Sequence, residues 1–210
     1  MIPFLLLAIQ TAAPPQLVVL DTPVGAREPQ VAMHVRLPPE GSQGRAAVLH
    51  GCIHVAFGTP NAIYVSTSTD DAKTFEHPVR IAEVGRLALG MRRGPRIAVS
   101  DDWVVVTAIA GEEGGGRDGD LLCWRFRDDR TGVGPAVRLN PKPGAAREGL
   151  HAMASGPDDE LCCVWIDLDG DSPRICCAVS RNSGETWGPP VVVQQDGGAI
   201  CACRSEHRRR

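Results

Sequence analysis

An eight-residue motif that occurs twice constrains this chain more than any other feature of its sequence. Residues 68–75 read STDDAKTF and residues 180–187 read SRNSGETW, so both fit Ser-x-Asp/Asn-x-Gly/Ala-x-Thr-Trp/Phe. Residues 126–133 align as a decayed third copy that keeps the acidic position at Asp128. Because 58 residues separate Asp70 from Asp128 and 54 separate Asp128 from Asn182, the chain repeats a unit of about 55 residues.

Runs that favour β-strands recur in the same order within each unit. The 23 Gly and 17 Pro, against one Tyr and four Phe, suit short strands joined by tight turns. The strand candidates are residues 54–57 and 62–66, then 96–99, 103–108 and 120–124, then 151–154, 161–166 and 174–179. Four strands in about 55 residues predict an all-β chain of antiparallel, four-stranded β-propeller blades, of which about three are present.

The repeated motif has a structural explanation. A short carboxylate or amide at Asp70 or Asn182 can accept hydrogen bonds from the amides of a hairpin turn. Gly184 supplies a left-handed residue, a conformation that Ala72 adopts at a cost of about 1–2 kcal/mol. We therefore expect the motif to hold a turn on the outer edge of each blade rather than to act in catalysis.

A second repeat starts with an arginine in every copy, at residues 27–33, 93–99 and 147–153. Arg93 and Arg147 each precede the key position of their motif by 35 residues, and Arg27 precedes Asp70 by 43. All three enter the predicted innermost strands, where guanidinium groups could hold one carboxylate. The predicted binding residues are Arg27, Arg93, Arg96, Arg147 and Glu148. The alternative is that each arginine ties its own blade to a neighbour through a carboxylate or carbonyl.

These motifs resemble the Asp-box, or BNR, repeats of the sialidase superfamily over residues 27–193. The resemblance implies a six-bladed propeller with a site on its axis, opposite the boxes. It also implies three arginines on the substrate carboxylate, an aspartate as acid/base, and a tyrosine paired with a glutamate as nucleophile. The sialidase Arg-Ile-Pro signature is absent, the nearest string being residues 94–98, and the single tyrosine, Tyr64, lies in a strand beside a box where we expect it to pack. No catalytic residue is assigned.

The resemblance predicts a sialidase-like protein whose parent is a glycoside hydrolase acting on sialic acid or related glycans, with this chain inactive alone. The alternative functions are a propeller that binds a glycan or protein without cleaving it, and a non-functional truncation. Three blades do not close a ring, and open ends expose strand edges. The sequence therefore predicts an N-terminal fragment of a longer propeller.

The two ends of the chain differ from its middle. Residues 1–13 contain an apolar run followed by small residues, which predicts a signal peptide, although a buried first strand is the alternative. Residues 14–200 form the predicted partial propeller, and residues 201–210 an irregular basic tail. The signal peptide predicts a secreted or periplasmic protein, and no later stretch is predicted to span a membrane.

Charge and cysteine content limit the partners. A net charge of -3 favours neither nucleic acid nor an anionic membrane, so the expected partner is a glycan or another anionic small molecule. The eight cysteines lack zinc-site spacing, and we expect neither a metal nor a cofactor. A hairpin centred on residues 167–171 would set Cys162 opposite Cys177 and Cys163 opposite Cys176. These cysteines are either disulfides or small apolar strand residues.

Overall fold

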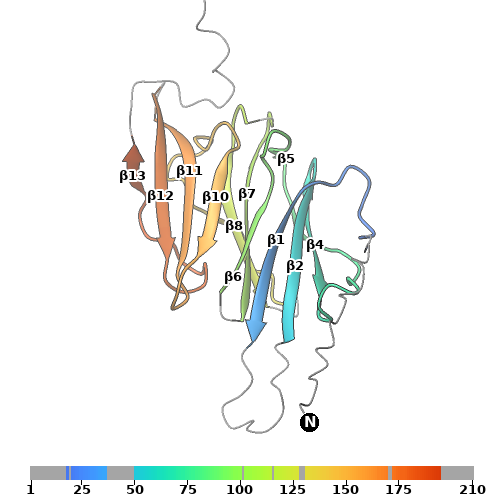
Figure 1. Ribbon diagram of the computed structural model, residues 1–210. Helices are drawn as coiled ribbons and strands as arrows, with labels where there is room; N and C mark the ends of the chain where they lie inside the picture. The colour runs from blue at the N-terminus through green and yellow to red at the C-terminus, as the bar shows by residue number, and fades with distance from the viewer. Residues whose placement is uncertain are drawn as a thin grey trace, which may run out of the picture.

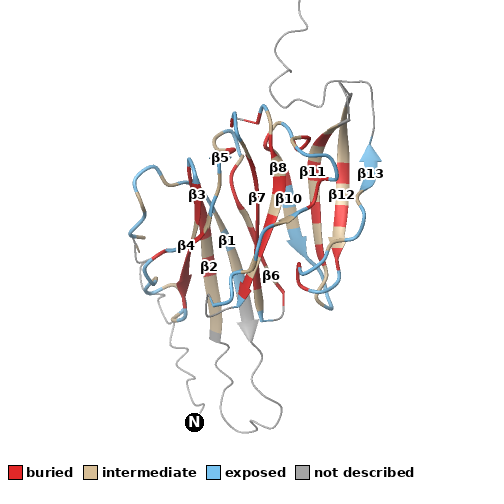
Figure 2. Ribbon diagram, turned by 180° about the vertical axis from the view of Figure 1, so that it is seen from behind, coloured by how far each residue is buried: buried red, intermediate tan, exposed pale blue. Residues whose placement is uncertain are grey.

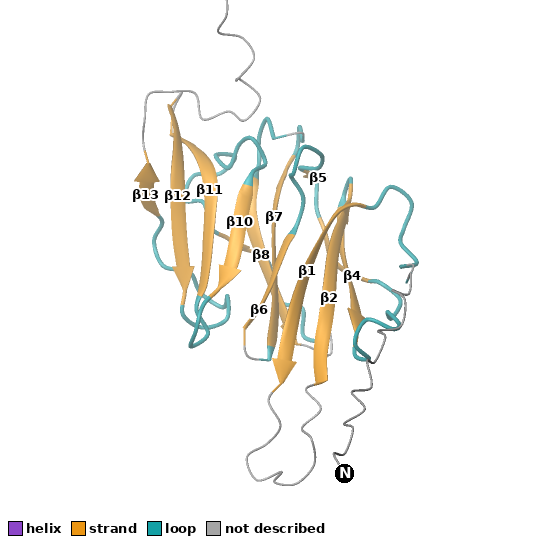
Figure 3. Cartoon of the chain, viewed as in Figure 1, coloured by secondary structure: helices purple, strands orange, loops and turns teal. Residues whose placement is uncertain are grey.

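The computed structural model describes residues 18, 20–36, 50–100, 102–114, 116–127, 131–169 and 172–194. Within these ranges the chain contains strands and loops and no helix, so the all-β prediction is confirmed (Figures 1 and 3). The described residues accordingly include no helix that could cross a membrane. The predicted signal peptide, the basic tail and Asp128 lie outside the described residues.

The strands form three antiparallel sheets that follow one another along the chain. The first sheet has the order β1 (Arg27–Arg36), β2 (His50–Thr59), β3 (Ala62–Ser68) and β4 (Val79–Glu83). The third sheet has the order β10 (His151–Ser155), β11 (Leu161–Asp169), β12 (Ser172–Ser180) and β13 (Val191–Gln194). Four-stranded antiparallel units in sequence order are what the repeat predicts.

The second sheet carries an additional short strand. It is built from β6 (Arg96–Ser100), β7 (Trp103–Gly111), β8 (Asp120–Arg127) and β9 (Val137–Arg138). The two-residue β5 (Arg86–Leu87) pairs with the far end of β7, along the same edge that β6 occupies. Residues 88–95 therefore form a loop whose two flanking strands are both hydrogen-bonded to β7.

The sheets pack face to face, with the second sheet between the other two. Successive strand residues point to opposite faces, so Val104 and Val106 lie in the core shared with the first sheet, while Val105 lies in the core shared with the third. The first strands of the three sheets are neighbours, because β6 contacts both β1 and β10. Figure 2 shows buried residues along most of β7 and also along β3, β8, β11 and β12. The first and third sheets each turn one face away from the second.

The first motif copy forms the turn between β3 and β4, and its aspartate organises that turn. Asp70 accepts hydrogen bonds from the Thr74 N–H (2.9 Å) and the Thr74 hydroxyl (2.6 Å), and Ser68 Oγ accepts one from the Ala72 N–H (3.0 Å). The hydrogen bonds that Asp70 accepts, led by that from the Thr74 hydroxyl and including one from the Ser68 hydroxyl (2.8 Å), lower its pKa from 3.8 to about 2.

The third copy repeats this pattern between β12 and β13. Asn182 Oδ1 accepts a hydrogen bond from the Thr186 N–H (2.9 Å), and Ser180 Oγ accepts one from the Gly184 N–H (2.9 Å). Asn182 Nδ2 donates to the Thr186 hydroxyl (2.9 Å). We call residues 68–75 and 180–187 the box turns. Their hydrogen bonds confirm the expected role of Asp70 and Asn182 in holding a turn.

The box turns lie at the opposite end of the sheets from the start of each first strand. In both outer sheets the third strand runs parallel to the first, because each neighbouring pair is antiparallel. A third strand therefore ends, and its box turn begins, far from the residue at which the first strand starts. The repeat arginines thus lie at the end opposite the box turns.

The predicted cysteine register is wrong by two residues. Cys162 pairs with Val179, Cys163 with Ala178, Cys176 with Trp165 and Cys177 with Val164. The reason is that the hairpin turns between Asp169 and Ser172, one residue later than predicted. Cys162 and Cys177 are consequently diagonal neighbours whose Sγ atoms are 3.3 Å apart, and both are free thiols.

Ala72 and Gly184 occupy equivalent left-handed positions of the two box turns, so exchanging alanine for glycine at one and glycine for alanine at the other should change the stability in opposite directions. Ala72 has φ 62° and Gly184 has φ 79°, and an added Cβ at Gly184 would lie 3.1 Å from Val105 Cγ1. We expect Ala72→Gly to raise the free energy of unfolding by about 1 kcal/mol and Gly184→Ala to lower it by about 1–2 kcal/mol. Urea unfolding measures both. Gly134→Ala, at a glycine with ordinary φ and open space, is the control, and equal effects of the two glycine-to-alanine changes would contradict the assignment.

The low pKa of Asp70 predicts an acid-dependent loss of stability. Because the folded pKa of about 2 lies below the ordinary 3.8, the ionised carboxylate stabilises the fold above about pH 4, and this contribution disappears as the pH falls towards 2. The Asp70→Asn variant should still form its box turn, because Asn182 holds the equivalent turn. It should lose less stability than the wild type between pH 5 and pH 2. Thermal melts over this range test it. Asp71→Asn removes a charge from the adjacent residue, whose carboxylate makes none of these hydrogen bonds, and should behave as the wild type.

Candidate functional site

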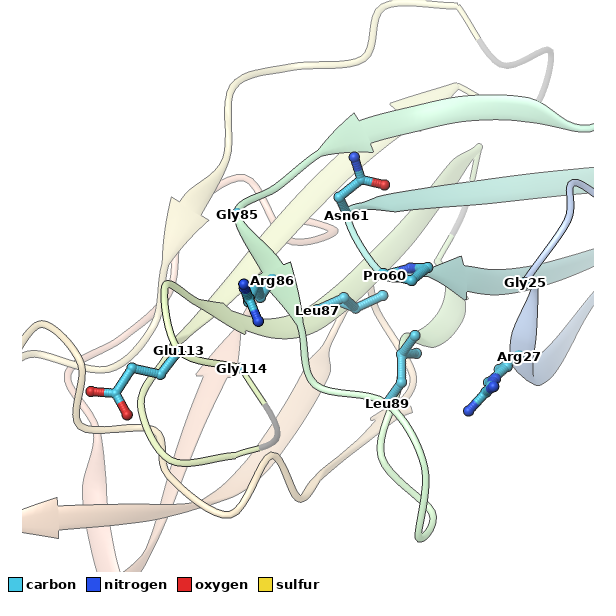
Figure 4. A pocket seen from close by; sticks show the side chains of 10 residues that line it. All are labelled: Gly25, Arg27, Pro60, Asn61, Gly85, Arg86, Leu87, Leu89, Glu113 and Gly114. Carbon is cyan, nitrogen blue, oxygen red and sulfur yellow. The ribbon is translucent and has the colours of Figure 1, made fainter.

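A cavity of about 510 Å³ opens between the first and second sheets at the end opposite the box turns. Its lining comes from the start of β1, the turn between β2 and β3, the segment around β5, and the loop that follows β7. Figure 4 shows Leu87 and Leu89 in the middle of the cavity, with Arg86 on one side and Arg27 on the other. The cavity thus has an apolar floor between two cationic side chains.

The floor depends on a close approach of β5 to the first sheet. A Cβ added to Gly58 would lie 2.3 Å from Leu87 Cδ2, so a larger residue there would require the Leu87 side chain to move. The Leu87 N–H donates to the Pro60 carbonyl (2.8 Å) and the Ala88 N–H to the Ile109 carbonyl (2.9 Å). The segment therefore bridges the two sheets and holds Leu87 and Leu89 in place.

Asp118 organises the loop that forms the other wall. Its carboxylate accepts hydrogen bonds from the backbone N–H groups of Glu112, Glu113 and Gly114, at 2.7–3.2 Å. Desolvation by itself would raise the pKa of Asp118, but these hydrogen bonds outweigh it, and the pKa lies below its usual value. The described residues of this glycine-rich stretch thus form a turn held by one carboxylate.

Two arginines of the cavity lining have no side-chain partner among the described residues. Neither the Arg27 nor the Arg86 guanidinium makes a hydrogen bond or ion pair with any described residue. Gly114 makes room for the stem of Arg86, because an added Cβ would lie 3.0 Å from Arg86 Cβ. Glu113 is the acidic residue of the lining, and its carboxylate is 3.6 Å from Arg117 Nε in an exposed pair. The cavity therefore offers unpaired positive charge.

The other predicted arginines are arranged differently. Arg93 donates from Nε to the Glu148 carbonyl, and its Nη2 lies 3.8 Å from Glu148 Oε2. Arg96 donates to the carbonyls of Pro95 (2.9 Å) and Gly94 (3.1 Å), with Glu28 as its acidic neighbour. Burial lowers the pKa of Arg96. Arg147 is exposed and makes no side-chain contact of this kind among the described residues.

The structure therefore brings Arg93 and Glu148 together, and among the described residues it shows no side-chain hydrogen bond or ion pair of Arg27 or Arg147 with them. Arg93 links the loop before β6 to the segment before β10, and Arg96 holds its own loop. These contacts are of the kind expected if the repeat arginines tie sheets together. Arg27 is the predicted binding residue that lines the cavity.

The residue after each repeat arginine is left-handed. Its φ is 55° at Glu28, 109° at Gly94 and 64° at Glu148. Such backbone is costly for a residue other than glycine, and the cost is met by neighbouring contacts. The Glu148 N–H donates to the Gly116 carbonyl (2.7 Å), and Gly94 lies where an added Cβ would be 2.6 Å from Glu28 Cβ. A residue with positive φ thus lies at the start of β1 and shortly before β6 and β10.

A buried histidine lies beside this end, between the second and third sheets. His151, the first residue of β10, is 7% exposed, and its Nε2 is 3.1 Å from Thr107 Oγ1. Its Nδ1 has no hydrogen-bond partner among the described residues. Burial, assisted by the charge of Arg96, lowers the pKa of His151 to about 3, so the imidazole is neutral at physiological pH. The described residues contain no cluster of His, Cys, Asp and Glu able to hold a metal ion.

No protein-family model and no curated protein matches the chain. Among solved structures it is similar to an alpha-L-arabinanase from Penicillium chrysogenum complexed with arabinobiose, at 14% identity and a TM-score of 0.47, covering 82% of this chain and 50% of that one. It is also similar to the alpha-L-arabinofuranosidase Arb93A from Fusarium graminearum, at 12% identity and a TM-score of 0.48, covering 85% and 53%. The chain spans about half the length of these two proteins. Similarity at this level assigns neither a family nor an activity.

Sequence reasoning did not find Arg86 or the ordering role of Asp118. Arg86 lies outside both repeats, so no alignment of the copies points to it. Asp118 follows a run of glycines, and an acidic residue there is a signal for a turn whose N–H groups need an acceptor. Asn61 lines the cavity because the turn between β2 and β3 is only two residues long. The strand candidates in the sequence did not determine the length of this turn.

Burial of neutral His151 predicts a stability that falls on mild acidification. The folded pKa of about 3 lies below the ordinary 6.5, so the unfolded chain takes up a proton first as the pH falls below 6.5. Between pH 7 and pH 5 this should cost about 2 kcal/mol of unfolding free energy. The loss should be absent in His151→Gln and retained in His77→Gln, whose histidine is exposed. Urea unfolding at both pH values measures it, and an unchanged loss in His151→Gln would refute the assignment.

Proposed function

We propose that this chain is part of a secreted, sialidase-like β-propeller that binds a glycan bearing a carboxylate. The observation that carries the proposal is the cavity at the end opposite the box turns, where Arg27 and Arg86 have no partner among the described residues. A guanidinium binds a carboxylate through two parallel hydrogen bonds. Unpaired arginines beside a cavity are therefore suited to an acidic ligand.

The shape and lining of the cavity fit a sugar of this kind. Leu87 and Leu89 offer an apolar surface for the C–H face of a sugar ring, and Asn61 and Glu113 offer hydrogen bonds to hydroxyl groups. Small-molecule sites usually combine such an apolar lining with a few polar groups. The resemblance of the box motifs to sialidases makes sialic acid the first ligand to test.

Binding without cleavage is favoured over hydrolysis by the position of Tyr64. A sialidase mechanism uses a tyrosine nucleophile, and Tyr64 is the single tyrosine of the chain. Its ring stacks on Phe57 with centroids 5.8 Å apart, within the first sheet, and it does not line the cavity. The parent protein can still be a glycoside hydrolase if other blades supply the catalytic groups.

The proposal predicts selective binding of acidic sugars. In isothermal titration, sialyllactose should bind at least about tenfold more tightly than lactose, because lactose lacks the carboxylate. Arg86→Ala and Arg27→Ala should each weaken sialyllactose binding by about tenfold or more. Arg181→Ala, which removes the same charge beside the second box turn, should leave binding unchanged.

Two results would contradict this function. Equal affinity for sialyllactose and lactose would remove the role of the carboxylate. Hydrolysis of a fluorogenic sialoside by the purified chain would show that the chain is an enzyme rather than a binding protein alone. Hydrolysis that persists in Tyr64→Phe would exclude a mechanism with Tyr64 as the nucleophile.

A further inference from the structure

The two cysteine doublets of the third sheet are each divided between its two faces. Successive strand residues point to opposite sides, so Cys163 and Cys176 lie in the core shared with the second sheet, and their neighbours point away from it. Cys163 and Cys176 are buried, whereas Cys162 and Cys177 are partly exposed. The inner two therefore serve as small apolar core residues. The outer two need a different explanation.

The outer cysteines lie within reach of each other. Cys162 pairs with Val179 and Cys177 with Val164, so the two thiols are diagonal neighbours on adjacent strands. Their Sγ atoms are 3.3 Å apart. A disulfide bond is about 2.05 Å long, so the two sulfurs need to approach by only about 1.3 Å. A small rotation about the Cα–Cβ bond of each cysteine covers this distance and leaves the pairing of β11 and β12 intact.

Every described residue that pairs directly with these two cysteines is aliphatic. The pairs are Ala154 and Val179 with Cys162, and Val164 and Val191 with Cys177. Each thiol therefore has the other as its hydrogen-bonding neighbour within the described part of the sheet. Burial, followed by the hydrogen bond with Cys177, raises the pKa of Cys162 to about 11. Cys162 is consequently a protonated thiol at neutral pH.

We propose that Cys162 and Cys177 are an oxidation site, at which a disulfide bond joins β11 to β12. Two partly exposed thiols on neighbouring strands, with adjacent sulfurs, carry this inference. The bond lies within one hairpin, so no residue outside β11 and β12 is needed to form it. It is independent of the proposed glycan binding, because the cavity lies between the first and second sheets.

The oxidation is a thiol–disulfide exchange with a low-molecular-weight disulfide as the oxidant. The thiolate of one cysteine attacks a sulfur of the oxidant and displaces a thiolate, which takes up the proton that the cysteine has lost. The second cysteine then attacks the protein sulfur of this mixed disulfide and displaces the second half of the oxidant as a thiol. The two cysteines together lose two electrons and two protons, and the oxidant gains both.

The new bond should stabilise the fold, because it closes a loop in the unfolded chain. Cys162 and Cys177 are 15 positions apart in the sequence. A cross-link over a loop of this length removes conformational freedom from the unfolded state, and the effect is largest where the folded hairpin is not distorted. In a chain of this size the melting temperature should rise by about 5–10 °C on oxidation.

Oxidation of the reduced, full-length chain by excess glutathione disulfide at mildly alkaline pH tests the proposal. Free thiols are then blocked with N-ethylmaleimide, and the chain is digested with trypsin without reduction. Cleavage at its arginines places Cys162 in the peptide of residues 148–174 and Cys177 in the peptide of residues 175–181. Mass spectrometry should find these two peptides joined, and fragmentation should locate the bond between Cys162 and Cys177.

Single substitutions distinguish this pair from the other cysteines. Cys162→Ala and Cys177→Ala should each abolish the joined peptides and leave the remaining thiol as a mixed disulfide with glutathione. Cys52→Ala, at a partly exposed cysteine of the first sheet, should form the bond as the wild type does. The melting temperature should rise on oxidation in the wild type and in Cys52→Ala, and stay unchanged in the other two variants. Melts of the reduced variants report whether they fold.

Three results would overturn the proposal. One is a wild type that keeps both thiols free, or carries glutathione on each of them, after oxidation. Another is a bond that joins Cys163 to Cys176, or either outer cysteine to a different residue. The third is an oxidised wild type that contains the bond but melts no higher than the reduced chain, because this would contradict closure by a small rotation of the side chains.

Discussion

Burial of the middle sheet on both faces is the constraint on which the rest of this structure depends. β7 is buried at every position from Val104 to Ala110, so its alternating side chains need an apolar neighbour on each side. The first sheet supplies one neighbour and the third supplies the other. A sheet of this kind cannot be stable alone in water, because the area that it would expose on either face contributes much of its folding free energy. The three sheets are therefore one cooperative unit.

The stacking also determines where ligand chemistry can occur. Residues in the interior of the sheets pack against one another, so charged side chains without a partner lie at the ends of the strands. There the loops do not take part in the hydrogen bonding between strands. At one end the box turns are closed by their own hydrogen bonds. At the other end the turn at residues 60–61, the segment around β5 and the loop ordered by Asp118 meet around a cavity. The two ends of the fold thus differ: one is closed by side-chain caps, and the other contains the cavity in which we propose that a ligand binds.

Local patterns in the sequence were sufficient for the features that arise locally. The strand positions and the hydrogen bonds of Asp70 and Asn182 follow from composition and turn chemistry within a few residues. The cysteine register was missed because a hairpin can place its turn at either of two neighbouring positions, and each residue of displacement moves the pairing by two. The contact between Arg93 and Glu148 spans 55 residues, and Arg86 belongs to no repeat, so only the packing of sheets against one another could reveal them.

The shared edge of β7 has a consequence for how this fold can vary. β5 and β6 bind the same edge of the same strand, so the loop at residues 88–95 leaves the sheet and returns to it nearby. A loop with both ends anchored in this way can gain or lose residues without moving the strands on either side, since loop closure costs little extra entropy with length. This loop carries Leu89 of the cavity floor and Arg93 of the contact with Glu148. It is therefore a position at which the lining of the cavity can change in length and sequence while the sheets stay intact.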